Sequence, residues 1–142
     1  MTDEEKRVKF RELFGEDKYK HFVLSIYQCY PWKNLDRLFY WQLDLLTEFA
    51  SKHGIEPIGI ENLRGIFTLC PVHNSELKVD TIPIVDGNKI IRNESYYNLE
   101  KEKFPMAYVN APRDLERMTY PENIEKVYCE KCRNVKKEYN AK

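Results

Sequence analysis

The sequence predicts an α+β protein in which an N-terminal helical half of about three helices packs on a small antiparallel sheet. Up to about residue 55, apolar side chains recur at spacings of three and four, whereas later stretches alternate in the manner of strands. The second half also contains two short Cys/His motifs, which the sheet is expected to carry. The length of 142 residues is typical of one domain. We therefore expect a single domain over residues 1–142, helical over about 1–55 and β-rich over about 56–142.

The first two helices are predicted from their ends and their apolar spacing. An acidic first turn suits a helix from Thr2 to Phe14, and Gly15 is a typical stop. A second helix is predicted from near Asp17 to the residue before Pro31. Its apolar positions are Tyr19, Phe22, Val23, Ile26, Tyr27 and Tyr30.

The third helix has the clearest apolar face. Asn34 is the expected N-cap, and Gly54 and Pro57 are expected to end the helix. Its buried face is predicted to contain Leu35, Leu38, Phe39, Gln42, Leu45, Leu46, Phe49 and Ala50. Trp41 and Leu43 lie off this face, so the helix is apolar over more than half of its circumference. We expect the first two helices to cover it; the alternative is a surface for a partner.

The rest of the chain is predicted to be mainly strands and loops. The predicted strands are Gly65–Leu69, Leu77–Val85, Phe104–Val109 and Lys126–Tyr128. Asp86 and Gly87 indicate a hairpin turn, and Pro83 is expected to confine its strand to an edge or a bulge. Residues 93–103 are expected to form an exposed loop or a short helix, and residues 133–142 a frayed helix.

Two Cys/His motifs together predict a metal site. Cys70 and His73 form a Cys-x-x-His motif, and Cys129 and Cys132 form a Cys-x-x-Cys motif. A two-residue gap lets both ligands of a tight turn point at one ion, and Pro71 suits such a turn because its φ is fixed. Three thiolates and one imidazole are the ligand set of a closed, tetrahedral, structural zinc site. We therefore predict that Cys70, His73, Cys129 and Cys132 bind Zn²⁺.

Other interpretations of these residues remain open. Cys70 could be a buried apolar residue, Cys129 and Cys132 a redox pair, and His73 an ordinary surface histidine. The segment between the motifs is also much longer than in compact zinc fingers. A long insertion is tolerable, because the entropy cost of closing a loop grows only logarithmically with its length. Cys29 has no nearby Cys or His in the sequence and is expected to be a residue at the edge of the core.

At these two motifs and the strands expected before them, the chain resembles zinc-ribbon-type proteins as a broad fold group. The resemblance implies that two turns at strand ends grip one structural zinc ion. It covers only the two motifs and their flanking strands, and it implies no particular activity. The long insert and the helical N-terminal half are departures from the ribbon pattern.

The complete set of four ligands leaves no open coordination position, and it favours a non-catalytic protein that acts as a macromolecular interaction or adaptor module, with another protein as the expected partner. Lys plus Arg and Asp plus Glu number 23 each, and this balance disfavours a bulk nucleic-acid binder. No convincing nucleophile with its base is present, and five glycines nearly exclude a glycine-rich phosphate loop. One alternative is a nucleic-acid accessory protein, and another is a thiol-redox or zinc-dependent enzyme. The first alternative would use the basic residues Lys126, Lys131, Arg133, Lys136 and Lys137.

The sequence favours a reducing intracellular location and no membrane partner. No apolar run approaches the length of a membrane span, and the acidic, polar first residues are unlike a secretory signal. Cysteines with metal-type spacing are also typical of a reducing compartment, where disulfides are rare. We therefore expect a cytoplasmic protein.

Overall fold

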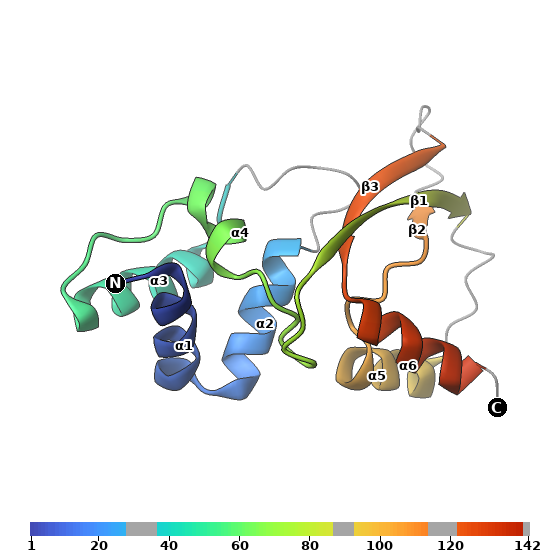
Figure 1. Cartoon of the computed structure of the whole chain (residues 1–142), viewed down its shortest axis with the longest axis horizontal. Helices are drawn as coiled ribbons and strands as arrows, with labels where there is room; N and C mark the ends of the chain where they lie inside the picture. The colour runs from blue at the N-terminus through green and yellow to red at the C-terminus, as the bar shows by residue number, and fades with distance from the viewer. Residues whose placement is uncertain (28–36, 87–92, 114–121, 141–142) are drawn as a thin grey trace. The chain divides into compact units, whose positions relative to one another are not determined.

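A computed structural model of the chain is shown in Figure 1; it describes residues 1–27, 37–86, 93–113 and 122–140, with only the backbone described at residues 86 and 111–113. The chain divides after Pro71 into two compact units, an N-terminal and a C-terminal one. The described residues mix six α-helices with a small sheet, against about three helices expected. The α+β class is confirmed. The single-domain organisation and the packing of the helical half on the sheet stay predictions.

The N-terminal unit begins with the three helices that the apolar spacing predicts. They are α1 (Asp3–Phe14), α2 (Glu16–Tyr27) and α3 (Tyr40–His53). The Thr2 hydroxyl accepts a hydrogen bond from the Glu5 N–H and caps α1. At the other end, Gly15 has φ of +84°, a conformation that glycine adopts without the strain of a side chain. This residue ends α1, and α2 begins immediately after it.

Helix α3 begins later than predicted. Its first residue is Tyr40, and the expected N-cap Asn34 lies outside the described residues. The Gln42 side chain explains the start, because its Oε1 accepts a hydrogen bond from the Phe39 N–H at 2.8 Å. The predicted end is confirmed: Gly54 follows His53 in the left-handed conformation, with φ of +62°.

The predicted strand over residues 65–69 is wrong. A 3₁₀ turn (Ile60–Asn62) leads instead into the short helix α4 (Leu63–Ile66). The side chains of Leu63, Ile66 and Phe67 have helical spacing, and all three are buried. Periodicity alone does not distinguish a strand from a helix in a short apolar run. Here the helical spacing becomes visible only when the segment is read from Leu63.

Aromatic rings form the core of the N-terminal unit. The Phe10 ring lies 4.7 Å from that of Phe22, 5.5 Å from that of Phe49 and 5.2 Å from that of Phe67, measured between centroids. The four rings come from α1, α2, α3 and the residue after α4, and all are fully buried. The Tyr27 hydroxyl donates to the Phe67 carbonyl at 2.6 Å and attaches the end of α2 to the same core.

The C-terminal unit contains the sheet. Strand β1 (Lys78–Asp86) is central and pairs antiparallel with β3 (Asn123–Tyr128), as predicted for a small antiparallel sheet. Strand β2 (Ala111–Arg113) pairs with the other edge of β1 in parallel, which was not predicted. The expected edge position of Pro83 is wrong for β1 as a whole. However, β2 pairs only from Ile84 onward, so among the described residues Pro83 has a partner strand on one side, in β3.

Two helices complete the C-terminal unit. Helices α5 (Glu94–Lys103) and α6 (Glu130–Asn140) lie side by side, joined by ring contacts of Phe104 with Tyr96 and Tyr139 (Figure 1). The predicted strand over residues 104–109 is wrong: this segment is a loop whose first four side chains are buried. The expected hairpin turn at Gly87 lies outside the described residues. None of the helices in the described part of the chain is long and apolar enough to cross a membrane.

Candidate metal centre

The first Cys/His pair lies in a tight turn after α4. Residues 71–73 form the turn between Cys70 and the end of the motif at His73. The next residue, Asn74, has φ of +54°, in the left-handed region that asparagine tolerates better than most residues. The hydroxyl of the following residue, Ser75, lies 3.2 Å from the Sγ atom of Cys129.

The second pair lies at the junction of β3 and α6. Cys129 follows the last residue of β3, and Cys132 lies in the first turn of α6. The Cys129 carbonyl accepts from the Arg133 N–H at 3.2 Å, and its Sγ atom accepts from the Cys132 N–H at 3.4 Å. Cys129 therefore acts as the N-cap of α6. The N-terminal end of a helix stabilises negative charge, which favours thiolate ligands at this position.

Strand pairing brings the two pairs together. Lys78, at the start of β1, pairs with Tyr128, at the end of β3. His73 comes shortly before β1 and Cys129 directly after β3, so both lie at the same end of the antiparallel pair. In its described parts, the long segment between the motifs contains β1, α5, β2 and β3. Its length is therefore no obstacle to the site, because the described parts of the insert form these elements and its two ends meet where Lys78 pairs with Tyr128.

The four predicted ligands form a cluster that could hold a metal ion. One ligand atom from each of Cys70, His73, Cys129 and Cys132 lies within 4.8 Å of all the others. The Nδ1 atom of His73 is 3.3 Å from the Sγ atom of Cys132 and 3.7 Å from that of Cys129. Tetrahedral zinc with ordinary bond lengths separates a sulfur from a nitrogen ligand by roughly 3.6 Å. The three thiols are fully buried and the imidazole is half-buried.

The geometry corrects one implication of the ribbon resemblance. Only the second pair follows a strand, and its Cys132 belongs to a helix, whereas the first pair follows α4. The site therefore combines a tight turn with a helix N-terminus, not two turns at strand ends. Cys29, expected to stand apart from the site, lies outside the described residues.

Two ion pairs connect β1 with the first turn of α6. Lys78 pairs with Glu130, and the hydrogen bond between them lowers the pKa of the Glu130 carboxyl. Asp80 pairs with Arg133 at 2.7 Å, and this hydrogen bond lowers the pKa of the Asp80 carboxyl. The Arg133 guanidinium also lies over the Tyr128 ring, 3.6 Å from its centroid.

Sequence reasoning missed the contacts of Ser75 and Arg133. Ser75 follows His73 by two residues and has no signal that distinguishes it from any other loop serine. Arg133 is adjacent to Cys132, so its position is visible in the sequence. Its acceptors lie at Asp80, Ala107 and Tyr108, far away along the chain.

No protein-family model matches this chain, and no curated protein or solved structure matches it either.

Proposed function

We propose that this chain is a non-catalytic protein that holds one structural Zn²⁺ ion and acts by binding another protein. The observation that carries the proposal is the convergence of Cys70, His73, Cys129 and Cys132, with all four donor atoms within 4.8 Å. Thiolate and imidazole ligands in a tetrahedral arrangement favour zinc among the common metal ions. Ions that prefer oxygen ligands, such as Mg²⁺ and Ca²⁺, have no matching donors in this cluster.

The completeness of the ligand set supports a structural role. Catalytic zinc sites keep one coordination position for water or substrate, and here protein donors account for all four. The three cysteines are fully buried, which also keeps solvent away from the ion. A metal held in this way would stabilise the fold of the C-terminal unit without acting on a substrate.

The metal content of the purified chain tests this proposal. We expect one zinc per chain by elemental mass spectrometry, and Cys70→Ser or Cys132→Ser should each lose most of it. His53→Asn, in the last turn of α3, is a matched control and should retain the metal. Cys29→Ser should likewise leave the stoichiometry unchanged. A wild-type chain without metal, or loss of metal in Cys29→Ser but not in Cys70→Ser, would contradict the ligand assignment.

The exposed start of α3 supports a protein partner. Phe39, Tyr40 and Leu43 are 70%, 88% and 45% exposed, and their spacing places them on one side of the helix start. Neighbouring exposed apolar side chains are typical of interaction surfaces. A photo-crosslinker in place of Tyr40 should form protease-sensitive, nuclease-resistant adducts in cells. The same crosslinker at Lys52, exposed at the other end of α3, is the control; equal labelling at both positions would contradict this surface.

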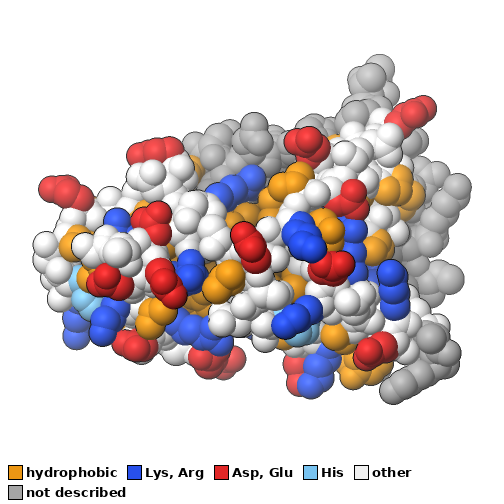
Figure 2. All heavy atoms as spheres, in the orientation of Figure 1, with side chains coloured by type: hydrophobic (Ala, Val, Ile, Leu, Met, Phe, Trp, Pro, Cys, Tyr) orange, Lys and Arg blue, Asp and Glu red, His pale blue; other side chains and the backbone are white. Residues whose placement is uncertain are grey.

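The nucleic-acid alternative has weaker support. Arg133 is engaged with Asp80, and its guanidinium covers the Tyr128 ring that would otherwise stack on a base. Lys126 lies over the Tyr108 ring, 4.6 Å from its centroid. On the face drawn in Figure 2, basic and acidic side chains are interspersed. A salt-dependent gel shift at low ionic strength would favour the alternative, and its absence would exclude it.

A thiol-redox function is the second candidate, because Cys129 caps a helix in a Cys-x-x-Cys motif. Burial opposes it: both thiols of the motif are fully buried, whereas a thiol that attacks another protein's disulfide must be accessible. Alkylation of the native, metal-loaded chain separates the two functions. Structural zinc predicts no labelling of Cys129 or Cys132 until a chelator is added, and rapid labelling beforehand would favour redox chemistry.

A further inference from the structure

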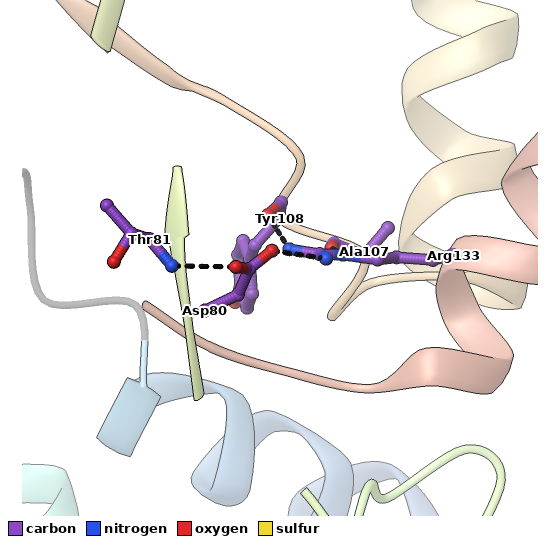
Figure 3. Close-up of polar contacts among 5 residues, drawn as sticks. All are labelled: Asp80, Thr81, Ala107, Tyr108 and Arg133. Carbon is purple, nitrogen blue, oxygen red and sulfur yellow. Dashed lines mark hydrogen bonds and ion pairs between the residues drawn. The ribbon is translucent and has the colours of Figure 1, made fainter. Parts of the chain in front are cut away.

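Arg133 contacts three segments of the C-terminal unit around the metal cluster. Its Nε and Nη2 atoms donate to the carbonyls of Ala107 and Tyr108, each at 2.8 Å. Its Nη1 atom donates to the Asp80 carboxylate at 2.7 Å (Figure 3). The guanidinium also packs on the Tyr128 ring, and the side chain is only 17% exposed. All three hydrogen bonds use the planar, multi-donor geometry that distinguishes arginine from lysine.

The loop that receives two of these bonds also contacts the metal cluster. The Met106 carbonyl accepts a hydrogen bond from the Cys129 N–H at 2.8 Å. Tyr108, two residues later, has φ of +41°, a conformation that bulky L-residues rarely adopt. Its ring packs on the buried isoleucines of the sheet, while its carbonyl is bound by Arg133. The arginine therefore stabilises a strained loop whose backbone holds the first cysteine of the second pair.

The contact with Asp80 connects Arg133 to β1, the strand that follows the first Cys/His pair. Asp80 lies in β1, the strand that follows His73, and its carboxylate also accepts from the Thr81 N–H at 2.8 Å (Figure 3). Arg133 lies in α6 directly after Cys132. The Asp80–Arg133 pair therefore sets the spacing between the strand after one ligand pair and the helix that carries the other.

We infer that Arg133 is a positioning residue of the metal centre, an inference that rests on the proposed zinc site. It orients the first turn of α6 and the loop at residues 106–108. It thereby holds the Sγ atoms of Cys129 and Cys132 close enough to the His73 imidazole for all three to bind one ion. Residues that orient metal ligands without touching the metal commonly change its affinity by about 10- to 100-fold.

A second ion pair provides an internal control. Lys78 and Glu130 connect the same two elements, β1 and the first turn of α6. Their side chains are 53% and 58% exposed, and neither binds the loop at residues 106–108 in the described structure. Exposed ion pairs contribute little because solvent screens them. If the connection between β1 and α6 alone determined the zinc affinity, loss of either ion pair would weaken zinc binding equally. If Arg133 acts through the loop and its hydrogen bonds, only loss of the Arg133 contacts will weaken it.

The test compares four variants of the full chain with the wild type. Arg133→Met keeps an unbranched side chain and removes every donor, whereas Arg133→Lys keeps the charge and one donor group. Asp80→Asn removes the charge of one acceptor, and Lys78→Met breaks the control pair. Zn²⁺ affinity is measured by competition with a chromophoric chelator, and the visible absorption of the Co²⁺-substituted chain reports the coordination geometry.

We expect Arg133→Met to weaken zinc binding by about 10- to 100-fold, with a smaller loss for Asp80→Asn and partial recovery in Arg133→Lys. Lys78→Met should stay within about twofold of the wild type. The Co²⁺ spectrum separates positioning from general support of the fold. A purely structural role would lower the unfolding temperature and leave the spectrum of the Co²⁺-saturated chain unchanged, whereas positioning predicts an altered tetrahedral spectrum.

Different results would overturn the two proposals separately. A wild-type chain that binds no zinc or cobalt would overturn the zinc site together with this inference. A wild-type chain that binds zinc, with Arg133→Met equally tight or with Lys78→Met equally weakened, would overturn the positioning role alone. Should Arg133→Met fail to fold, Asp80→Asn and Arg133→Lys decide the question. Wild-type affinity and spectrum in both of these variants would be evidence against the inference.

Discussion

The two units of this chain are stabilised by different means. The N-terminal unit is built around four fully buried phenylalanine rings, centred on Phe10. The sheet of the C-terminal unit has a small cluster of three buried isoleucines with Tyr108 packed against it. This unit also contains three residues of the candidate metal cluster, His73, Cys129 and Cys132, and the hydrogen bonds of Arg133. Apolar burial contributes in proportion to area, whereas metal and arginine bonds depend on exact partners. The first unit should therefore tolerate removal of the metal, which the second should not.

Metal removal should separate the units most clearly. Structural zinc contributes on the order of 10 kcal/mol in small domains, so a chelator should unfold much of the C-terminal unit. The N-terminal unit keeps its ring core, and its helices should stay protected. Hydrogen–deuterium exchange with mass spectrometry measures both in one experiment. Equal loss of protection in α2 and α6 would contradict the comparison.

The reverse experiment removes the ring core. Phe10→Ala should cost about 3–5 kcal/mol, because it deletes a fully buried ring in contact with Phe22, Phe49 and Phe67. We expect the N-terminal unit to melt at lower temperature, while the chain retains one zinc. Val8→Ala, at a position 46% exposed on the same helix, is the control and should have little effect. Loss of zinc in the folded Phe10→Ala chain would show that the two units depend on each other.

The same contrast explains what the sequence could predict. Helices α1 and α2 follow from local spacing and end residues such as Thr2 and Gly15. The four residues of the candidate metal cluster follow from the motif spacing, because coordination chemistry restricts the gap within each pair. Both signals are local in the sequence, so both could be found without a structure.

The missed features depend on partners that are distant in the sequence. The loop at residues 104–109 was predicted as a strand because it is a short apolar run. Its backbone is instead bound by Cys129 and Arg133, more than twenty residues away. Similarly, α3 begins at Tyr40 because the Gln42 side chain bonds both the Phe39 N–H and the Ser25 hydroxyl. Propensity at Asn34 carries no information about that buried side-chain contact.

A smaller effect is expected from a single hydroxyl in the N-terminal unit. Tyr27→Phe removes the buried donor to the Phe67 carbonyl and should cost about 1–3 kcal/mol. The variant also changes the dependence on pH. Burial raises the pKa of Tyr27 to about 12 from an ordinary value near 10. The folded state thus retains a proton that the unfolded state releases, and stability falls as the pH rises from about 10 to 12.

This alkaline loss should be smaller in Tyr27→Phe, because the phenol that titrates is gone. Some loss should remain, since burial also raises the pKa of Tyr19. Urea unfolding of the N-terminal unit is monitored by circular dichroism at several pH values between 9 and about 12. The measurement gives the slope of the unfolding free energy against pH. Tyr40→Phe, at an exposed phenol, is the matched control. An unchanged slope in Tyr27→Phe would refute the assignment to this residue.

The smallest effects should come from one matched pair of helix caps, one in each unit. The Thr2 hydroxyl accepts from the Glu5 N–H at the start of α1, and the Asn93 side chain accepts from the Tyr96 N–H at the start of α5. Either residue replaced by alanine should cost about 1 kcal/mol in its own unit. Because the two substitutions remove the same kind of hydrogen bond, any difference between their effects reflects the unit in which each helix lies.

We expect Thr2→Ala to destabilise α1 equally with and without zinc. The effect of Asn93→Ala should be measurable only in the zinc-loaded chain, because the unit that contains α5 is already unfolded after chelation. Hydrogen exchange in α5 and α1, with and without chelator, is the measurement. A loss in Asn93→Ala that persists unchanged in the metal-free chain would mean that the C-terminal unit folds without its metal.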